Sequence, residues 1–382
     1  MTAEKTTLHQ LLDAGQSPWI DYITRDLLKS GGLQRRIDQG IVGMTSNPTI
    51  FQKAIADGAS DYDEDLQSMV RDNKDIPAIY DGLVLDDIRR AATILRPVYD
   101  SSDAHDGYVS IEVPPELSHD TDRTLVEALR IFSQLNMPNI MVKIPGTAEG
   151  LPAIRHAIAE GVNINVTLLF SVDNYRLVAE AYIAGLEDRA SAGQPIDRIA
   201  SVASFFVSRV DTAVDKKLDA LIDAAGDEAR KSELRALQGK AAIANAKLAY
   251  VAYQELFSGP RWEALAAHGA KEQRPLWAST STKNKAYRDV MYAEGLIGPD
   301  TVDTMPVETI DNFLDHGTVA QTLTQDVDAA RTELGALERA GVSMDEVTRQ
   351  LQDDGVRLFT ESFNELIGTI SGKRDEMMSH AR

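Results

Sequence analysis

The sequence predicts an α/β fold, specifically a closed (β/α)8 TIM barrel with extra helices. Two observations predict it: eight short apolar or alternating runs bounded by turn residues, and helical patterns that separate these runs. The 382 residues exceed a typical single domain, but barrels with insertions reach this length as one unit. The eight candidate strands are residues 17–23, 40–46, 107–113, 139–145, 161–170, 198–206, 274–280 and 301–307.

Helical patterns follow the strands in chain order. Apolar residues recur at helical spacing over 125–135, behind a polar start at 120–122. The next helix is predicted over 151–158, with Pro152 in its first turn, and another begins after Ser171. Strands separated by helices need right-handed parallel crossovers, and eight such units fit a closed barrel better than an open sheet. A doubly wound sheet is the alternative.

Two stretches are too long to be simple connections between strands. The segment near 50–107 is acidic and helical, and the segment near 212–270 contains an Ala-rich helical run. We expect both to form extra helices packed on the barrel. Residues near 344–378 are expected to form a closing C-terminal helical segment. The chain is therefore predicted to be one domain over 1–382.

The charge balance restricts the partners of the chain. Its 59 acidic and 39 basic residues give a net charge of −20, which repels nucleic acid and anionic lipid at long range. We therefore expect no nucleic acid and no membrane as partner, and an anionic substrate would need a local cationic pocket. The lack of Cys suits a reducing cytosol, and no secretion signal or bilayer-length apolar run stands out. We expect a cytoplasmic protein, either monomer or homodimer.

Three neighbouring strands carry polar side chains on one face only. Strand residues alternate between faces, and in a barrel covered by helices both faces should be apolar. The polar faces consist of Tyr108, Ser110 and Glu112, of Met141 and Lys143, and of Asn163, Asn165 and Thr167. We interpret them as converging on the barrel interior. The alternative is a set of antiparallel strands with one solvated side.

Lys143 stands out among these polar residues. It lies between Val142 and Ile144, just before a Pro-Gly-Thr turn, where the carboxyl end of a barrel strand carries enzyme chemistry. Burial disfavours the charged form of a lysine, and a neutral amine attacks a carbonyl to form a Schiff base. The protonated imine stabilises the carbanion left when a carbon–carbon bond breaks. No metal or cofactor is expected, since the His residues are scattered without zinc-ligand spacing. A solvated edge lysine is the alternative.

Five segments carry a resemblance to a known family. In chain order they read TSNPTIF, SIEV, MVKIP, NVTLLFS and SFFVSR, each at the end of a predicted strand. With them the chain resembles transaldolase from about Trp19 to Pro306. The resemblance implies a cofactor-free transferase that moves a dihydroxyacetone unit from sedoheptulose 7-phosphate to glyceraldehyde 3-phosphate. The products would be erythrose 4-phosphate and fructose 6-phosphate, in the non-oxidative pentose phosphate pathway. Small-molecule sugar phosphates are the expected partners.

The same resemblance implies four catalytic residues. Lys143 in MVKIP corresponds to the Schiff-base nucleophile, and Glu112 in SIEV to the acid/base. Thr167 in NVT corresponds to its partner in holding a catalytic water. Asp21 resembles the carboxylate that removes the proton from the C4 hydroxyl of the substrate. Two alternatives stay open: Glu112 as only a charge partner of the lysine, and Asp21 as a helix cap ahead of Thr24.

Six further residues are implied to bind substrate. Asn47 and Asn165 resemble side chains that bond substrate hydroxyls or the Schiff base, although Asn47 before Pro48 could simply form a turn. Ser204 and Arg209 resemble the phosphate-binding residues of the family. An Arg suits a phosphate through its bidentate donors, and the start of a helix also favours anions.

The remaining two substrate-binding residues lie where the chain departs from the family pattern. After the seventh strand, better-known members have an Arg in a Ser-Phe-Arg-Asn segment, whereas this chain reads ASTSTKN. Ser279 corresponds to the Ser and Lys283 supplies the charge, with Tyr287 and Arg288 as alternatives. Two alternatives to the function also stay open: an aldolase that cleaves fructose 6-phosphate to free dihydroxyacetone, and a non-catalytic sugar-phosphate-binding barrel.

Overall fold

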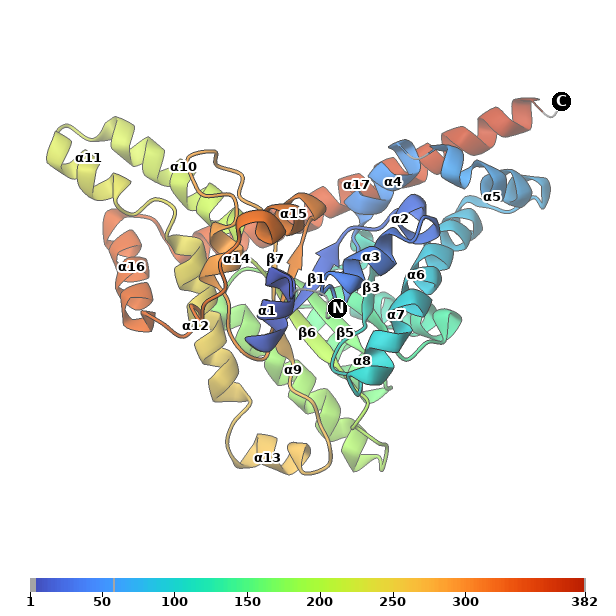
Figure 1. The fold of residues 1–382 in the computed structure, drawn as a ribbon, viewed down its shortest axis with the longest axis horizontal. Coiled ribbons are helices and arrows are strands. Elements are labelled where there is room, and N and C mark those ends of the chain that lie inside the picture. Colours follow the sequence, from blue (N-terminus) through green and yellow to red (C-terminus); the bar gives the residue numbers. More distant parts are fainter. Residues whose placement is uncertain (1–4, 58, 381–382) are drawn as a thin grey trace.

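Eight parallel strands close into a barrel in sequence order in a computed structural model that describes residues 5–57 and 59–380 (Figure 1). β1 pairs with β8 as well as with β2, so the sheet has no free edge. The predicted barrel is confirmed, and the doubly wound alternative is wrong. The strands are β1 (Gln16–Asp21), β2 (Met44–Thr45), β3 (Val109–Glu112), β4 (Ile140–Pro145), β5 (Ile164–Leu169), β6 (Ser201–Phe206), β7 (Arg274–Ala278) and β8 (Thr301–Met305).

Each strand overlaps one of the eight predicted runs, and β2 is the shortest. Its pairing nevertheless starts before Met44, because the Val42 amide donates to the Pro18 carbonyl and the Val42 carbonyl accepts from the Gly107 amide. Gly43 lies between these residues, against the indole of Trp19. A Cβ at this position would lie 2.4 Å from the Trp19 ring, so a residue larger than glycine would clash with the indole here.

Helices surround the barrel and extend beyond it on two sides (Figure 1). They are α1 (Thr7–Asp13), α2 (Arg25–Lys29), α3 (Gly32–Asp38), α4 (Pro48–Asp57), α5 (Ala59–Arg71), α6 (Ile76–Ser101), α7 (Thr121–Leu135), α8 (Gly150–Ala159), α9 (Val172–Ser191), α10 (Ser208–Ala224), α11 (Glu228–Arg235), α12 (Ala241–Leu256), α13 (Pro260–Ala266), α14 (Met291–Gly295), α15 (Val307–His316), α16 (Val327–Ala340) and α17 (Met344–His380), with a 3-10 turn at Pro115–Leu117.

Local sequence signals set several helix starts. The Asp120 side chain accepts from the amide of Arg123 and caps α7, and Ser171 accepts from Asn174 and caps α9, as the predicted polar starts require. The long segment after β2 contains α4, α5 and α6, while α10 to α13 follow β6. No helix within the described ranges is both long and apolar enough to cross a membrane. That the chain forms one domain stays a prediction.

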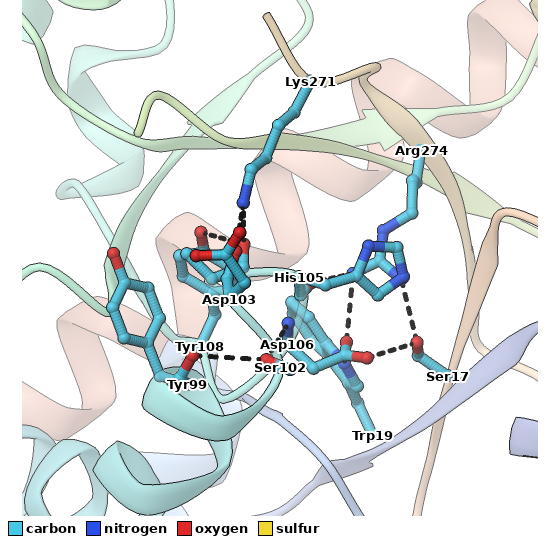
Figure 2. A network of polar contacts seen from close by, with 11 residues as sticks. Ser17, Trp19, Tyr99, Ser102, Asp103, His105, Asp106, Tyr108, Lys271 and Arg274 are labelled. Carbon is cyan, nitrogen blue, oxygen red and sulfur yellow. Dashed lines mark hydrogen bonds and ion pairs between the residues drawn. The ribbon is translucent and has the colours of Figure 1, made fainter. Parts of the chain in front are cut away.

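The amino end of the barrel is closed by a buried polar network (Figure 2). Asp106 accepts hydrogen bonds from Ser17 at 2.7 Å and from the Trp19 indole at 3.1 Å, and it pairs with Arg274 at 3.0 Å. Arg274 opens β7 and also donates to the His105 carbonyl. The charges are mutually satisfied, which is typical of the stabilising end of a barrel rather than the catalytic end.

Candidate active site

Lys143 lies on β4, in the half of the strand nearer its carboxyl end. It faces Glu112 of β3 on one side and Asn165 of β5 on the other, and its side chain is almost fully buried. The Lys143 Nζ donates to the Ser46 carbonyl at 3.1 Å and lies 3.5 Å from Glu112 Oε2. The amine is thus shielded from solvent and has one carboxylate within proton-transfer range.

Glu112 and Thr167 flank this amine and lack other partners. Apart from the Lys143 contact, the carboxylate oxygens of Glu112 have no hydrogen bond among the described residues, and neither has Thr167 Oγ1. Burial raises the pKa of Glu112 to about 7, against the lowering effect of the Lys143 charge. A carboxyl with this pKa can both accept and donate a proton near neutral pH.

Asp21 ends β1 and faces the same space. Thr45 donates to its Oδ1 at 2.7 Å, and Thr45 in turn shares a 2.7 Å hydrogen bond with Thr304. Burial raises the pKa of Asp21, opposed by Lys143, Thr45 and Arg209. Thr24, and not Asp21, caps α2 by accepting from the Leu27 amide. The capping alternative for Asp21 is therefore wrong.

Asn165 belongs to a buried hydrogen-bonded chain across three strands. Its Nδ2 donates to Ser110 Oγ at 3.0 Å, and its Oδ1 accepts from Ser204 Oγ at 2.7 Å. The Ser204 hydroxyl therefore donates its hydrogen to Asn165, although Ser204 also lines the cavity. Asn47 also lines the cavity, and its Oδ1 accepts from the Ile50 amide at the start of α4. Asn47 therefore has the local backbone role that was the alternative interpretation, while its amide nitrogen has no partner in the described chain and stays a candidate substrate donor.

A cavity of about 300 Å³ opens at the carboxyl end of the strands and is lined by most of the predicted residues. Glu112 and Asn165 do not line it but lie in register on either side of Lys143. Lys143, Asp21 and Thr167 lie at its base, with Arg209, Ser279 and Lys283 on its wall. The described residues include no group of three His, Asp or Glu side chains that could hold a metal ion. That the chemistry is metal-independent stays a prediction.

Three cations on the cavity wall form no ion pair with a described residue. Arg209, Lys283 and Lys53 form neither an ion pair nor a hydrogen bond within the described part of the chain. Burial lowers the pKa of Arg209 more than the nearby charge of Asp21 raises it, so its charge is held at a free-energy cost that a bound anion would relieve. In a chain of net charge −20, this is the local cationic pocket expected for an anionic substrate.

Ser279 connects the loop after β7 to the start of α10. Its φ of 57° is left-handed, and its carbonyl accepts from the Ser208 amide at 3.1 Å while the two hydroxyls lie 3.0 Å apart. Ser208 precedes Arg209 at the start of α10, and both Ser279 and Arg209 line the cavity. Strained backbone of this kind is typical of functional sites.

Tyr287 and Arg288 do not line the cavity and are not alternatives to Lys283. The Tyr287 hydroxyl donates to Asp215 at 2.6 Å, and Arg288 pairs with Glu294 at 2.7 Å. Sequence reasoning missed Lys53 and the two aromatic rings that contact Arg209, which are Phe206 at 5.2 Å and Phe359 at 6.0 Å from its Cζ. Lys53 follows the TSNP segment by about a helical turn and a half, a signal that could have found it.

Known proteins match this chain over nearly all of its length. The profile of a family described as Transaldolase/Fructose-6-phosphate aldolase matches residues 18–370. A transaldolase of Trichodesmium erythraeum is 47% identical over 369 residues, covering 96% of this chain and 97% of the relative. A transaldolase of Thermobifida fusca is 49% identical over 366 residues, covering 95% and 97%. A second transaldolase of Nostoc punctiforme is 49% identical over 370 residues, covering 96% and 97%.

Proposed function

We infer that this chain, which belongs to the transaldolase/fructose-6-phosphate aldolase family, is a transaldolase, a transferase of a three-carbon ketone unit. Likeness of 47–49% to proteins named transaldolase, over 95% or more of both chains, carries this conclusion. The finer proposal is transfer of a dihydroxyacetone unit from sedoheptulose 7-phosphate to glyceraldehyde 3-phosphate, within the pentose phosphate pathway and in the cytoplasm.

The proposed reaction begins at Lys143. Its ammonium passes a proton to Glu112, and the neutral amine attacks the ketone carbon of the donor to form a carbinolamine. Loss of water then gives the protonated Schiff base. The 3.5 Å separation of the two groups and the Glu112 pKa of about 7 support this exchange. Thr167, whose Oγ1 has no partner among the described residues, is proposed to orient the water that Glu112 protonates and deprotonates.

Asp21 is proposed to open the carbon–carbon bond. It takes the proton from the C4 hydroxyl, the C3–C4 bond breaks, and the aldehyde leaves while the electron pair moves into the imine as an enamine. The acceptor aldehyde then adds to the same carbon and recovers the proton from Asp21. The raised pKa of this carboxylate supports a role as base. Hydrolysis through Glu112 frees Lys143.

The substrate phosphate is proposed to bind Arg209, Lys53 and Lys283. All three line the cavity and form no ion pair with a described residue, which supports an anionic ligand. We assign Ser204 with Asn165 to the polar floor beneath the Schiff base instead, since its proton is already donated to Asn165.

Trapping with borohydride tests the proposed function. Incubation with fructose 6-phosphate and sodium borohydride should reduce the Schiff base and leave a mass adduct on the peptide that contains Lys143. The Lys143→Ala variant should show no adduct and no turnover. An unlabelled wild-type peptide would contradict the proposal. Rapid formation of free dihydroxyacetone without an acceptor aldehyde would instead identify an aldolase.

A further inference from the structure

The C-terminal helix α17 crosses the mouth of the barrel and forms part of the cavity wall. Figure 1 shows it running alongside α4, far in sequence from the strands it covers. Gln352, Gly355, Phe359 and Ser362 recur at helical spacing on the face toward the barrel. Among them, Phe359 lines the cavity.

Contacts on both sides of Phe359 fix the position of this helix. Gln352 Nε2 donates to the carbonyls of Gly146 at 3.1 Å and Leu168 at 3.2 Å. Gly146 directly follows β4, and Leu168 lies next to the last residue of β5. Gly355 lies so close to Leu168 that a Cβ would come within 2.8 Å of its side chain. Further along, Ser362 accepts from Thr49 of α4 at 2.8 Å.

The Phe359 ring contacts a side chain with few other partners. Arg209 makes no hydrogen bond or ion pair in the described chain, and besides the electrostatic attraction to Asp21 its guanidinium contacts the rings of Phe206 at 5.2 Å and Phe359 at 6.0 Å. Cation–π attraction and apolar contact restrict the rotamers of a long side chain that would otherwise be mobile. A preorganised guanidinium binds a phosphate with a smaller entropic loss.

We propose that Phe359 is a positioning residue for substrate recognition: its ring holds Arg209 toward the cavity and thereby selects phosphorylated sugars over unphosphorylated ones. The proposal rests on the transaldolase function and deepens it. α17 thus serves the phosphate-binding wall, although it lies outside the barrel.

Three variants test this role in the full-length protein. In Phe359→Ala and Phe359→Leu, we expect the inhibition constant of inorganic phosphate and the KM for fructose 6-phosphate to rise about ten-fold, the range of a partly desolvated cation–π contact. Borohydride trapping of Lys143 with dihydroxyacetone, which has no phosphate, should be unchanged. Phe359→Tyr keeps the aromatic ring and should therefore have the wild-type inhibition constant for phosphate and the wild-type KM.

Leu358→Ala is the matched control, because Leu358 is the neighbouring residue of α17 and is 41% exposed. It should leave both constants unchanged. Equal loss of phosphate binding and dihydroxyacetone trapping, unaltered phosphate inhibition, or failure of the Tyr variant to restore binding would overturn the proposal. If wild-type Lys143 is not labelled by dihydroxyacetone, the proposed function itself fails, which separates the two results.

Discussion

Glu112 owes its unusual pKa to burial beside Lys143. Burial favours the neutral carboxyl, while the attraction to Lys143 favours the carboxylate. The pKa of Glu112 near 7 reflects burial that is stronger than the attraction to Lys143. Near neutral pH both protonation states of this carboxyl are populated, 3.5 Å from the Lys143 amine, so Glu112 can act as acid and as base during formation and hydrolysis of a Schiff base.

Replacing Glu112 by Gln should separate chemistry from binding. The amide cannot exchange protons, so we expect kcat to fall about 10²- to 10⁴-fold while KM for the donor changes only a few-fold. Steady-state kinetics across pH 5.5–9 would also lose the limb near pH 7 that Glu112 gives the wild type. A parallel loss of sugar binding and turnover would instead show that Glu112 acts only as a charge partner of Lys143.

The cations of the cavity wall should contribute unequally to phosphate binding. Arg209 contacts two aromatic rings and offers bidentate donors, so Arg209→Ala should raise KM for fructose 6-phosphate roughly 10- to 100-fold. Lys53 and Lys283 are exposed, so Lys53→Ala and Lys283→Ala should each raise it less than ten-fold. Lys231→Ala, on α11 at an i,i+3 ion pair with the exposed Glu228, is the control and should change nothing. A larger effect of Lys283 than of Arg209 would contradict the assignment.

Strands and their polar faces were the most predictable part of the molecule. The alternation over β3, β4 and β5 depends only on the two-residue period of a strand, so it indicated which side chains face inward. Glu112, Lys143 and Asn165 are accordingly neighbours in register. Strand limits and the pairing before Met44 could not be read from the pattern, because backbone hydrogen bonds there do not depend on side-chain polarity.

Contacts between elements remote in sequence could not be predicted. Phe359 reaches the cavity only because α17 crosses the barrel mouth, and an apolar residue on a long helix has no signal that distinguishes a cavity wall from ordinary core. Likewise, Asp106 and Arg274 pair across 168 positions to close the amino end. Periodicity gives the buried face of a helix but not the element that covers it.

The close contact between Gly43, just before β2, and the Trp19 ring predicts that a larger residue at position 43 destabilises the protein. Gly43→Ala would place a methyl group 2.4 Å from the indole, and we expect overpacking to lower the free energy of unfolding by about 1–3 kcal/mol. Urea unfolding measures it. Gly368→Ala in α17 is the same substitution in open space and should be neutral or slightly stabilising. A Gly43→Ala protein as stable as wild type would mean that the strand can shift away from the ring.

The two ends of the barrel divide stability from chemistry. At the amino end the charges of Asp106 and Arg274 satisfy each other, whereas at the carboxyl end Lys53, Arg209 and Lys283 have no counter-ion within the described ranges. A chain of net charge −20 thus places three cations without an ion pair among the described residues at the cavity that Lys143 lines. Electrostatic attraction of phosphorylated sugars to this opening should weaken as salt is added.

One buried carboxyl outside the cavity should make the stability of the whole protein depend on pH. Asp303 of β8 is 1% exposed, accepts one hydrogen bond from Thr280 at 2.9 Å, and has a second oxygen without a partner among the described residues. Burial raises its pKa from 3.8 to about 7. The folded protein therefore binds this proton more tightly than the unfolded chain does.

The sign of the effect follows from this difference in proton binding. Below pH 3.8 both states are protonated and the full stability is present; between 3.8 and 7 the unfolded chain ionises first, so the free energy of unfolding falls as pH rises. Roughly three pKa units correspond to about 4 kcal/mol as an upper value. Glu112 and Asp211, whose pKa values burial raises to about 7 and about 6, contribute to the same decline. We therefore expect Asp303→Asn to show a smaller decline in urea unfolding between pH 4 and 8, while Asp72→Asn, at an exposed site, keeps the wild-type decline. Parallel pH curves for wild type and Asp303→Asn would show that Asp303 is ionised in the folded state at little cost.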